Sequence, residues 1–409
     1  MSRTIESPLA LTEAQDRILA LAEPVETIEV SLGEALGLVL AEPVVADIDH
    51  PPFDRASVDG YAVKFDEATV GALLRVVRPI RLGEANLEAG EAGRVRAGDP
   101  TPPGSDSVAR PSTVRTDPEV GPTRVIEVLE GLQPGQNVTR RGAYLNGGAT
   151  LLEAGTRIKP SMVPLLASQG CVQPICHRRV GVSVLTVGSQ WVGPAEAPTM
   201  NRERNATNAA LVALSIRAEA MPRDYQAVSG SKVRTALERA TTAPVVVILG
   251  PASLHLARAL SAIGYEPVVE QVAIESIGHA RHGIIRDDDG KVINHIFQFP
   301  SHPFAASVAF LLLVQPLIAR LQGDLNQQVR SVVAFAEGES QPATRRRTRV
   351  QPATLRIDPN GQRIGESIPG DKDDFLAWSR ADGLLIFPEQ SGPWRGGDPV
   401  EFVPIVPGF

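Results

Sequence analysis

The sequence has few cysteines and few aromatic residues, and it lacks both an excess of positive charge and a long apolar run. Its 40 Lys and Arg stand against 47 Asp and Glu, which gives a net charge of −7. A negative net charge disfavours binding to nucleic acid or to an anionic membrane surface. The longest apolar stretch, Phe304 to Val314, is interrupted at Ser307 and is shorter than the ~18 residues that cross a bilayer. We expect a buried helix there and no membrane span.

The cysteines and the first residues of the chain exclude two further classes. Cys171 and Cys176 lie close together, with His177 beside the second, but a zinc site would still lack a fourth ligand. We therefore expect two buried, reduced thiols. The opening residues MSRTIESPLALTEAQDR have no basic end followed by an apolar core, which disfavours a secretory signal. The expected location is the cytoplasm.

Two apolar runs rich in β-branched residues indicate a parallel sheet. VGVSVLTVG (180–188) and VVVILG (245–250) each stop at a glycine, and such runs are typical of strands buried on both faces. Helical patterns at 207–220 and 231–240 separate the runs, and another follows at 254–263. This alternation predicts an α/β domain. Capping-box patterns at Thr12 and Gln15, and at Ser31 and Glu34, predict two helices near the N-terminus.

The loops that follow the predicted strands are the first candidate site. In open α/β sheets, ligands bind beyond the carboxyl ends of the strands. Two of these loops are GSQWV after the first strand and GPASLH (250–255) after the second, and a third candidate loop, PSHP (300–303), precedes the helix at Phe304. Gly250 and Ser253 suit a phosphate cradle, although Pro251 removes one N–H donor from it.

Two acids in the stretch PPFDRASVDGYAV (51–63) are the second candidate. Asp54 and Asp59 fall in a short loop before the strand-like residues that start at Tyr61. These acids have two interpretations. Aspartates in turns often accept hydrogen bonds from the nearby backbone, which is a structural role, and they can also bind ligands.

Four histidines form a third cluster. His279 and His282 belong to HARH, with His295 and His302 further along. Histidine clusters are typical of metal sites, but no acid or cysteine completes this set. We interpret them as a loop of surface histidines.

Taken together, these motifs resemble the MoeA family, the molybdopterin molybdenumtransferases that include the gephyrin C-terminal domain. The family reads PPFDNSAMDGYAV where this chain has PPFDRASVDGYAV, so Asp54, Asp59, Gly60 and Tyr61 align without a gap. The segment at 89–108 is similar to the family segment that ends TGAPLPEGADAV. The segments PSHPFAASVAF and SRADGLLIFPEQSGPWRGGDPVEF also fit, so the resemblance runs nearly from end to end.

The resemblance and the sequence pattern together predict a multidomain α/β plus β fold. The expected parts are a helical linker domain at 1–50 and 145–176, an inserted β-rich domain at 51–144, a central three-layer α/β molybdopterin-binding domain at 177–325, and a C-terminal β-barrel-like domain at 326–409. The resemblance also implies a homodimer. Its pterin site would lie between the α/β domain of one subunit and the β-rich domains of the other.

The resemblance implies a magnesium-dependent transferase that inserts molybdate into adenylylated molybdopterin and releases AMP. Asp59 would be the catalytic residue. The residues implied in substrate binding are Asp54, Gly60, Tyr61, Thr207, Asn208, Gly250, Ser253, Pro300, Ser301 and Pro303.

The chain departs from the family where charge would matter. The family's NVRRRGED becomes NVTRRGAYL, which puts Ala143 and Tyr144 in place of two acids. Its TGDEL becomes VGSQW, and its KPGKP becomes residues 275–279, with Glu275 first. Because lysines are lost and an acid is gained, we expect this last segment to repel phosphate.

These departures leave three functions open. The chain is a working transferase with a rearranged site, a non-catalytic paralogue that acts as a dimeric binding or scaffold protein, or a pterin carrier. Tyr144, His255 and His279 are the candidates to replace lost groups.

Overall fold

The computed structural model describes residues 7–77, 86–117, 125–275, 277, 279–325, 331–338, 347–369, 375–389 and 393–405. Ser276 and Gly278 of the segment at 275–279 lie outside the described residues. The chain divides into two compact units. The first unit holds Met1–Glu42, Ala154–Pro160 and Gln173–Phe409, and the second holds Pro43–Glu153 and Ser161–Val172. The boundaries of the four expected domains stay a prediction.

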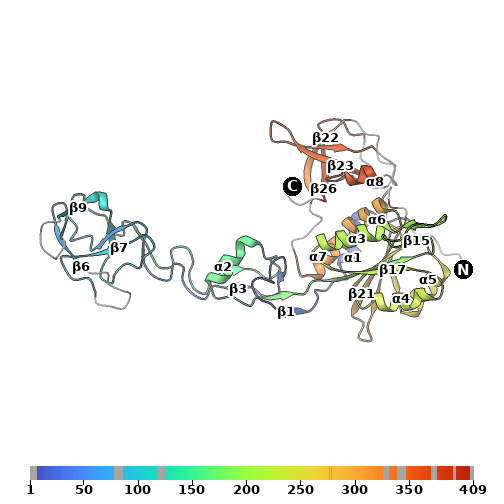
Figure 1. Cartoon of the computed structure of the whole chain (residues 1–409), viewed down its shortest axis with the longest axis horizontal. Coiled ribbons are helices and arrows are strands. Elements are labelled where there is room, and N and C mark those ends of the chain that lie inside the picture. The colour runs from blue at the N-terminus through green and yellow to red at the C-terminus, as the bar shows by residue number, and fades with distance from the viewer. Residues whose placement is uncertain are drawn as a thin grey trace. The chain divides into compact units, whose positions relative to one another are not determined.

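A six-stranded sheet forms the centre of the first unit (Figure 1). Its strands, in spatial order, are β17 (Met221–Val228), β14 (Gly181–Val187), β18 (Val245–Leu249), β21 (Val292–Phe299), β20 (Arg281–Arg286) and β19 (Glu266–Val269). The first four strands are parallel, and β20 runs antiparallel to both of its neighbours. The strand order therefore brings the carboxyl ends of β14, β18 and β21 to one edge.

Helices cover both faces of this sheet, which makes the predicted three layers. One face carries α1 (Leu11–Leu19), α3 (Ala206–Arg217), α6 (Pro303–Ala309), the π-helical segment η3 (Phe310–Val314) and α7 (Gln315–Leu321). The other face carries α4 (Lys232–Ala240) and α5 (Leu254–Ala262). Successive side chains of β18 point to opposite faces of the sheet. Val247 therefore packs in the hydrophobic core on one face and Ile248 in the core on the other.

The continuous helix Pro303–Leu321 is the apolar helix expected from the sequence. Its length and composition would allow it to cross a membrane, but 89% of its most apolar stretch is buried inside the protein. Phe310 and Leu317 are completely buried in the core beneath the sheet. The helix is therefore core, as predicted.

A closed β-barrel forms the C-terminal part of the first unit, as predicted. Its strands are β22 (Val332–Glu337), β24 (Arg363–Ser367), β23 (Arg349–Ile357), β25 (Gly383–Phe387) and β26 (Pro399–Pro404), accompanied by helix α8 (Phe375–Ser379). The ring of Phe304 in α6 meets that of Trp378 in α8 edge-on at 5.3 Å. Arg217 also donates a hydrogen bond to the carbonyl of Pro404 at 2.6 Å. These contacts attach the barrel to the α/β layers.

A small sheet completes the first unit. Its strands are β1 (Thr27–Glu29), β13 (Ile175–His177) and β2 (Val39–Leu40). Ser31 donates to Glu34 at 2.7 Å, as in a capping box, but only a turn follows, so the predicted helix is wrong. Cys176 is buried on β13, as expected, whereas Cys171 is only half-buried.

The second unit is rich in β-structure. Its main sheet has the order β8 (Ser107–Ala109), β5 (Gly60–Val63), β7 (Glu91–Val95), β6 (Leu73–Val77), β10 (Val125–Val128) and β9 (Val114–Asp117). Two short pairs join β11 (Val138–Thr139) to β4 (Arg55–Ala56) and β12 (Thr150–Leu152) to β3 (Val44–Val45). The helical elements are η1 (Pro111–Thr113), η2 (Pro160–Met162), which begins at the unit boundary, and α2 (Val163–Ser168).

Candidate functional site

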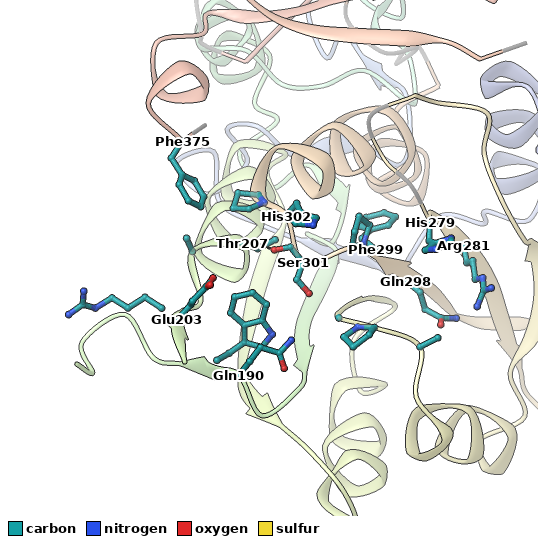
Figure 2. A pocket seen from close by; sticks show the side chains of 18 of the residues that line it. Gln190, Glu203, Thr207, His279, Arg281, Gln298, Phe299, Ser301, His302 and Phe375 are labelled. Atoms are coloured by element: carbon teal, nitrogen blue, oxygen red, sulfur yellow. Dashed lines mark hydrogen bonds between the residues drawn. The ribbon is translucent and has the colours of Figure 1, made fainter. Parts of the chain in front are cut away.

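A cleft of about 760 Å³ lies at the carboxyl ends of β14, β18 and β21 in the first unit (Figure 2). Its volume is in the range that holds a small organic ligand. The polar residues that line the cleft are Gln190, Asn201, Glu203, Arg204, Thr207, His279, Arg281, Gln298, Ser301 and His302. The sequence-predicted loops after the three strands therefore do meet around one cleft.

Gly250 allows the strands to open into this cleft. Its φ of +129° lies in the region that side chains rarely adopt, and an added Cβ would meet the carbonyl oxygen of Val187 at 2.1 Å. The ends of β14 and β18 can approach each other because this residue is glycine. Of the predicted residues near it, Pro300, Ser301 and Pro303 also line the cleft.

Helix α3 begins at the cleft and uses its polar residues mainly for structure. Asn205 caps the helix by accepting a hydrogen bond from the backbone N–H of Asn208 at 3.2 Å. The side chain of Asn208 is buried and donates to the carbonyl of Val184 at 3.3 Å. Thr207 lines the cleft, but its hydroxyl donates to the carbonyl of Ser301. Of the predicted pair, only Thr207 therefore borders the cleft.

Ser253 and His255 have positions outside the lining. Ser253 caps α5 by accepting a hydrogen bond from the backbone N–H of Leu256 at 3.1 Å, which fixes the loop after β18. His255 is exposed on the first turn of α5 and is not part of the cleft lining. Of the residues predicted in this loop, Ser253 is therefore structural, whereas Gly250 lines the cleft.

Arg281 and Gln298 bring polar groups to one end of the cleft, where Figure 2 also shows His279. Arg281 on β20 pairs directly with Gln298 on β21, so both side chains point to the same face of the sheet. The guanidinium Nε of Arg281 lies 3.7 Å from a carboxylate oxygen of Glu270. Gln298 donates to the hydroxyl of Tyr265 at 3.3 Å, and burial raises the pKa of Tyr265 to about 12.

Two strands, β15 (Trp191–Val192) and β16 (Glu203–Arg204), form the other end of the cleft. They pair in parallel, and the backbone N–H of Glu203 donates to the carbonyl of Gln190 at 2.8 Å. Glu203 is the one carboxylate among the described lining residues, and Figure 2 shows it on the opposite side of the cleft from Arg281. The one carboxylate of the described lining therefore lies away from Arg281, with Arg204 next to it in the same strand.

Glu275 does not face the cleft. Its backbone N–H donates to the carbonyl of Thr348, and its carboxylate lies 3.9 Å from the guanidinium of Arg349, which begins β23 of the barrel. Its carboxylate is therefore paired with a cation and does not line the cleft, and the expected repulsion of phosphate by this segment stays a prediction.

Two of the four histidines lie in the core, so the interpretation as a surface loop is wrong for them. His282 on β20 and His295 on β21 are 1% and 3% exposed, and their Nε2 and Nδ1 atoms are 3.1 Å apart. Burial lowers the pKa of His295 to about 4 and that of His282 well below 6.5. The register of β20 with β21 places both histidines on the same face of the sheet. The ring centre of Phe297 lies 4.7 Å from that of His282.

The acids of the loop at 51–63 lie in the second unit and hold backbone segments together. Asp54 receives hydrogen bonds from Arg140 at 2.6 Å and from the backbone N–H of Arg141 at 2.7 Å. Burial works to raise the pKa of Asp54, but these hydrogen bonds outweigh it and lower the pKa. Asp59 is exposed and accepts a hydrogen bond from the backbone N–H of Ala97 at 2.8 Å. Both contacts fit the structural interpretation of these acids.

Gly60 and Tyr61 continue this loop into β5. An added Cβ at Gly60 would meet the carbonyl oxygen of Ala109 at 2.0 Å, so the close approach of β5 and β8 requires glycine. Tyr61 is half-buried against the core of the unit. Tyr144 is 66% exposed in the same unit, and the guanidinium of Arg55 lies 5.7 Å from its ring centre.

The fold and the site together define a class of protein. The first unit is a three-layer α/β protein with a ligand-sized cleft at the carboxyl ends of parallel strands, joined to a β-barrel. The MoeA N-terminal region (domain I and II) matches residues 9–170. Over these residues the chain belongs to the MoeA family.

The relatives and a solved structure match most or nearly all of the chain. The chain is 29% identical to molybdopterin molybdenumtransferase 1 of Mycobacterium tuberculosis, with 96% of this chain and 98% of the relative covered. It is 28% identical to the molybdopterin molybdenumtransferase of Haemophilus influenzae, with 77% and 78% covered. The crystal structure of a molybdopterin biosynthesis MoeA protein from Pyrococcus horikoshii matches with a TM-score of 0.82 at 25% identity, covering 98% of this chain and 100% of that one.

Sequence reasoning missed Arg281, Gln298 and Tyr265. Each lies on or beside a strand that has no clear apolar run, and they meet only because β19 pairs with β20 and β20 pairs with β21. The signal that could have found them is the alternation of buried and exposed residues along β20 and β21. One face of this strand pair is buried and carries His282, Ile284, His295 and Phe297. Recognising that face would have placed Arg281 and Gln298 on the other one.

Proposed function

We propose that this protein acts in molybdenum cofactor biosynthesis as a molybdopterin molybdenumtransferase. It binds adenylylated molybdopterin in the cleft of the first unit, inserts molybdate at the dithiolene and releases AMP. The observation that supports this most strongly is the match over 98% of this chain to a MoeA structure, together with the ligand-sized cleft in the first unit of this chain. The expected setting is a homodimer in the cytoplasm.

The cleft suits the ligand in size and in polarity. Its volume of about 760 Å³ suits a ligand of nucleotide size. Arg281 and Gln298 at one end provide donors for the phosphoanhydride, and Trp191 and Phe299 provide apolar surface for a ring system. Ser301 and Thr207 border the middle of the cleft and help to fix the position of the bound molecule.

Magnesium, which the family resemblance implies, does not fit the groups of this cleft. Mg²⁺ prefers several oxygen ligands, usually with one or two carboxylates, whereas Glu203 is the one carboxylate in the described part of the lining. Within the described residues, no group of three or more His, Cys, Asp or Glu is placed to hold a metal ion. Molybdate needs no such metal site in the protein, because it is a substrate of the proposed transfer.

The assay is AMP release by the purified protein supplied with adenylylated molybdopterin and molybdate, with Asp59→Asn beside the wild type. Asparagine keeps the oxygen that accepts the Ala97 N–H and removes only the charge, so the fold should persist. Asp66→Asn is the matched control, because Asp66 is an exposed acid of the same unit.

We expect AMP release by the wild type and by Asp66→Asn. We expect a loss of at least about tenfold in Asp59→Asn, because the family resemblance implies that this carboxylate reaches the reacting molecule from the β-rich domain of the partner subunit. Absence of release by the wild type, with the dimer intact by analytical ultracentrifugation, would leave the scaffold alternative. Release by Asp59→Asn at the wild-type rate would remove the catalytic role of that residue.

A further inference from the structure

We propose that the cleft holds a phosphate group of its ligand directly, through Arg281 assisted by His279 and His302, and without a divalent cation. The identity of the ligand rests on the proposed function, but the mode of anion binding does not. The chemical class is a phosphate ester or anhydride, such as the phosphoanhydride of an adenylylated compound.

Arg281 is available to a ligand because its partner in the structure holds it weakly. Glu270 lies 3.7 Å from its Nε, beyond hydrogen-bonding length, and the two side chains are 40% and 46% exposed. Exposed ion pairs of this kind contribute about 1 kcal/mol or less. By contrast, Arg140 lies only 2.6 Å from Asp54. The buried Nε of Arg281 has no hydrogen-bond partner among the described residues, so the guanidinium is not fixed by a close carboxylate.

The geometry favours recognition of phosphate by arginine. A guanidinium presents parallel N–H donors that match two oxygens of one phosphate. Arg281 is directed to the cleft by its pairing with Gln298, whose amide lines the same end. His279 and His302 also line the cleft, and an imidazole donates an N–H in its neutral form and both of its N–H groups when protonated.

The acids that would oppose an anion lie elsewhere. Figure 2 shows Glu203 on the opposite side of the cleft from Arg281. Glu275 is paired with Arg349, and Glu270 is not part of the lining. At this end the described lining residues therefore present a guanidinium and no carboxylate, although the carboxylate of Glu270 lies 3.7 Å from Arg281. Such donors are the wrong ones for magnesium.

Calorimetric titration with inorganic pyrophosphate tests this mode of binding. Titrations are run on the whole protein in EDTA and again with Mg²⁺, for the wild type and for Arg281→Gln, Arg281→Lys and Arg258→Gln. Arg258 is the matched control, because it is an exposed arginine on α5 that does not line the cleft. Circular dichroism confirms that each variant is folded.

We expect the wild type to bind pyrophosphate in EDTA, and Mg²⁺ not to strengthen the binding. Arg281→Gln should weaken it about tenfold or more, the loss typical of one charged hydrogen-bonding group. Arg281→Lys should fall between the two, because it keeps the charge but not the paired donors, and Arg258→Gln should bind as the wild type does. Binding that appears only with Mg²⁺, or equal binding by wild type and Arg281→Gln, would overturn the proposal.

The pyrophosphate titration and the AMP-release assay can give different answers, so the two proposals can fail separately. Pyrophosphate binding through Arg281 without any AMP release would support this inference and contradict the proposed function. AMP release that persists undiminished in Arg281→Gln and stops in EDTA would support the function and overturn this inference.

Discussion

The buried histidine pair of β20 and β21 predicts that the α/β sheet loses stability in mild acid. Burial lowers the pKa of His295 to about 4, against 6.5 for the ordinary side chain, and lowers that of His282 in the same direction. Between these values the unfolded chain binds more protons than the folded chain does. The contribution of His295 to stability is therefore complete above about pH 6.5 and is lost as the pH falls toward 4.

The size of the effect follows from the shift. One unit of pKa corresponds to about 1.4 kcal/mol. At about pH 5 the unfolded chain protonates His295 and the folded chain does not, so the free energy of unfolding is about 2 kcal/mol lower than at neutral pH. Near pH 4 the loss reaches about 3 kcal/mol, a large part of the ~5–15 kcal/mol that stabilises a typical domain. The lowered pKa of Asp49 and Asp54 acts only at lower pH, below their ordinary value of 3.8.

Hydrogen–deuterium exchange measures this directly in the strands concerned. Exchange of peptides that cover β20 and β21 is followed between about pH 8 and pH 5 and corrected for the intrinsic exchange rate. We expect the free energy of opening in the wild type to fall by about 2 kcal/mol or more. His295→Gln should show a shallower dependence on pH, whereas His255→Gln, which changes an exposed histidine, should follow the wild type. A slope in His295→Gln as steep as that of the wild type would refute the reasoning.

Two further predictions concern single side chains. Gly250→Ala should lower stability by about 2 to 4 kcal/mol in thermal unfolding, because its Cβ meets the carbonyl oxygen of Val187 at an unfavourable φ. Gly33→Ala, where a Cβ meets nothing within 4 Å, should be nearly neutral, and equal losses in both would contradict this account. Asp54→Asn should cost about 1 kcal/mol in urea unfolding at neutral pH, because the Asp54–Arg140 pair is partly exposed. The difference from wild type should shrink in high salt, and a cost that is unaffected by salt would point away from charge.

The sequence predicted the elements whose local pattern is strong. The β-branched runs at 180–188 and 245–250 correspond to β14 and β18, and the pattern at 254–263 corresponds to α5. The pair β20 and β21 was missed because His282 and His295 interrupt the apolar pattern, although both are buried. At Ser31 and Glu34 the local signal was correct, since the hydrogen bond forms, but no helix follows it.

The site was predictable in place but only partly in composition. Glycine and proline after the strand ends marked the loops, and a general rule for open sheets placed the cleft there. Arg281 was not predictable, because it reaches the cleft through its register with Gln298, and register is not visible in either strand alone. Similarly, Asp54 meets Arg140 across 86 residues of sequence, and spacing alone gives no sign of that contact.

The discontinuous course of the first unit has a consequence for synthesis on the ribosome. Helix α1 packs in the core with Leu312, and Gln15 donates to the Leu312 carbonyl at 2.8 Å across 297 residues. The segment Pro43–Glu153 of the second unit leaves the ribosome long before that partner does. At ~5–20 residues per second of translation, the apolar face of α1, with Ala14 and Ile18, waits roughly 15 to 60 seconds for its core. The nascent chain therefore exposes the apolar face of an early amphipathic helix, which is the kind of segment that chaperones protect.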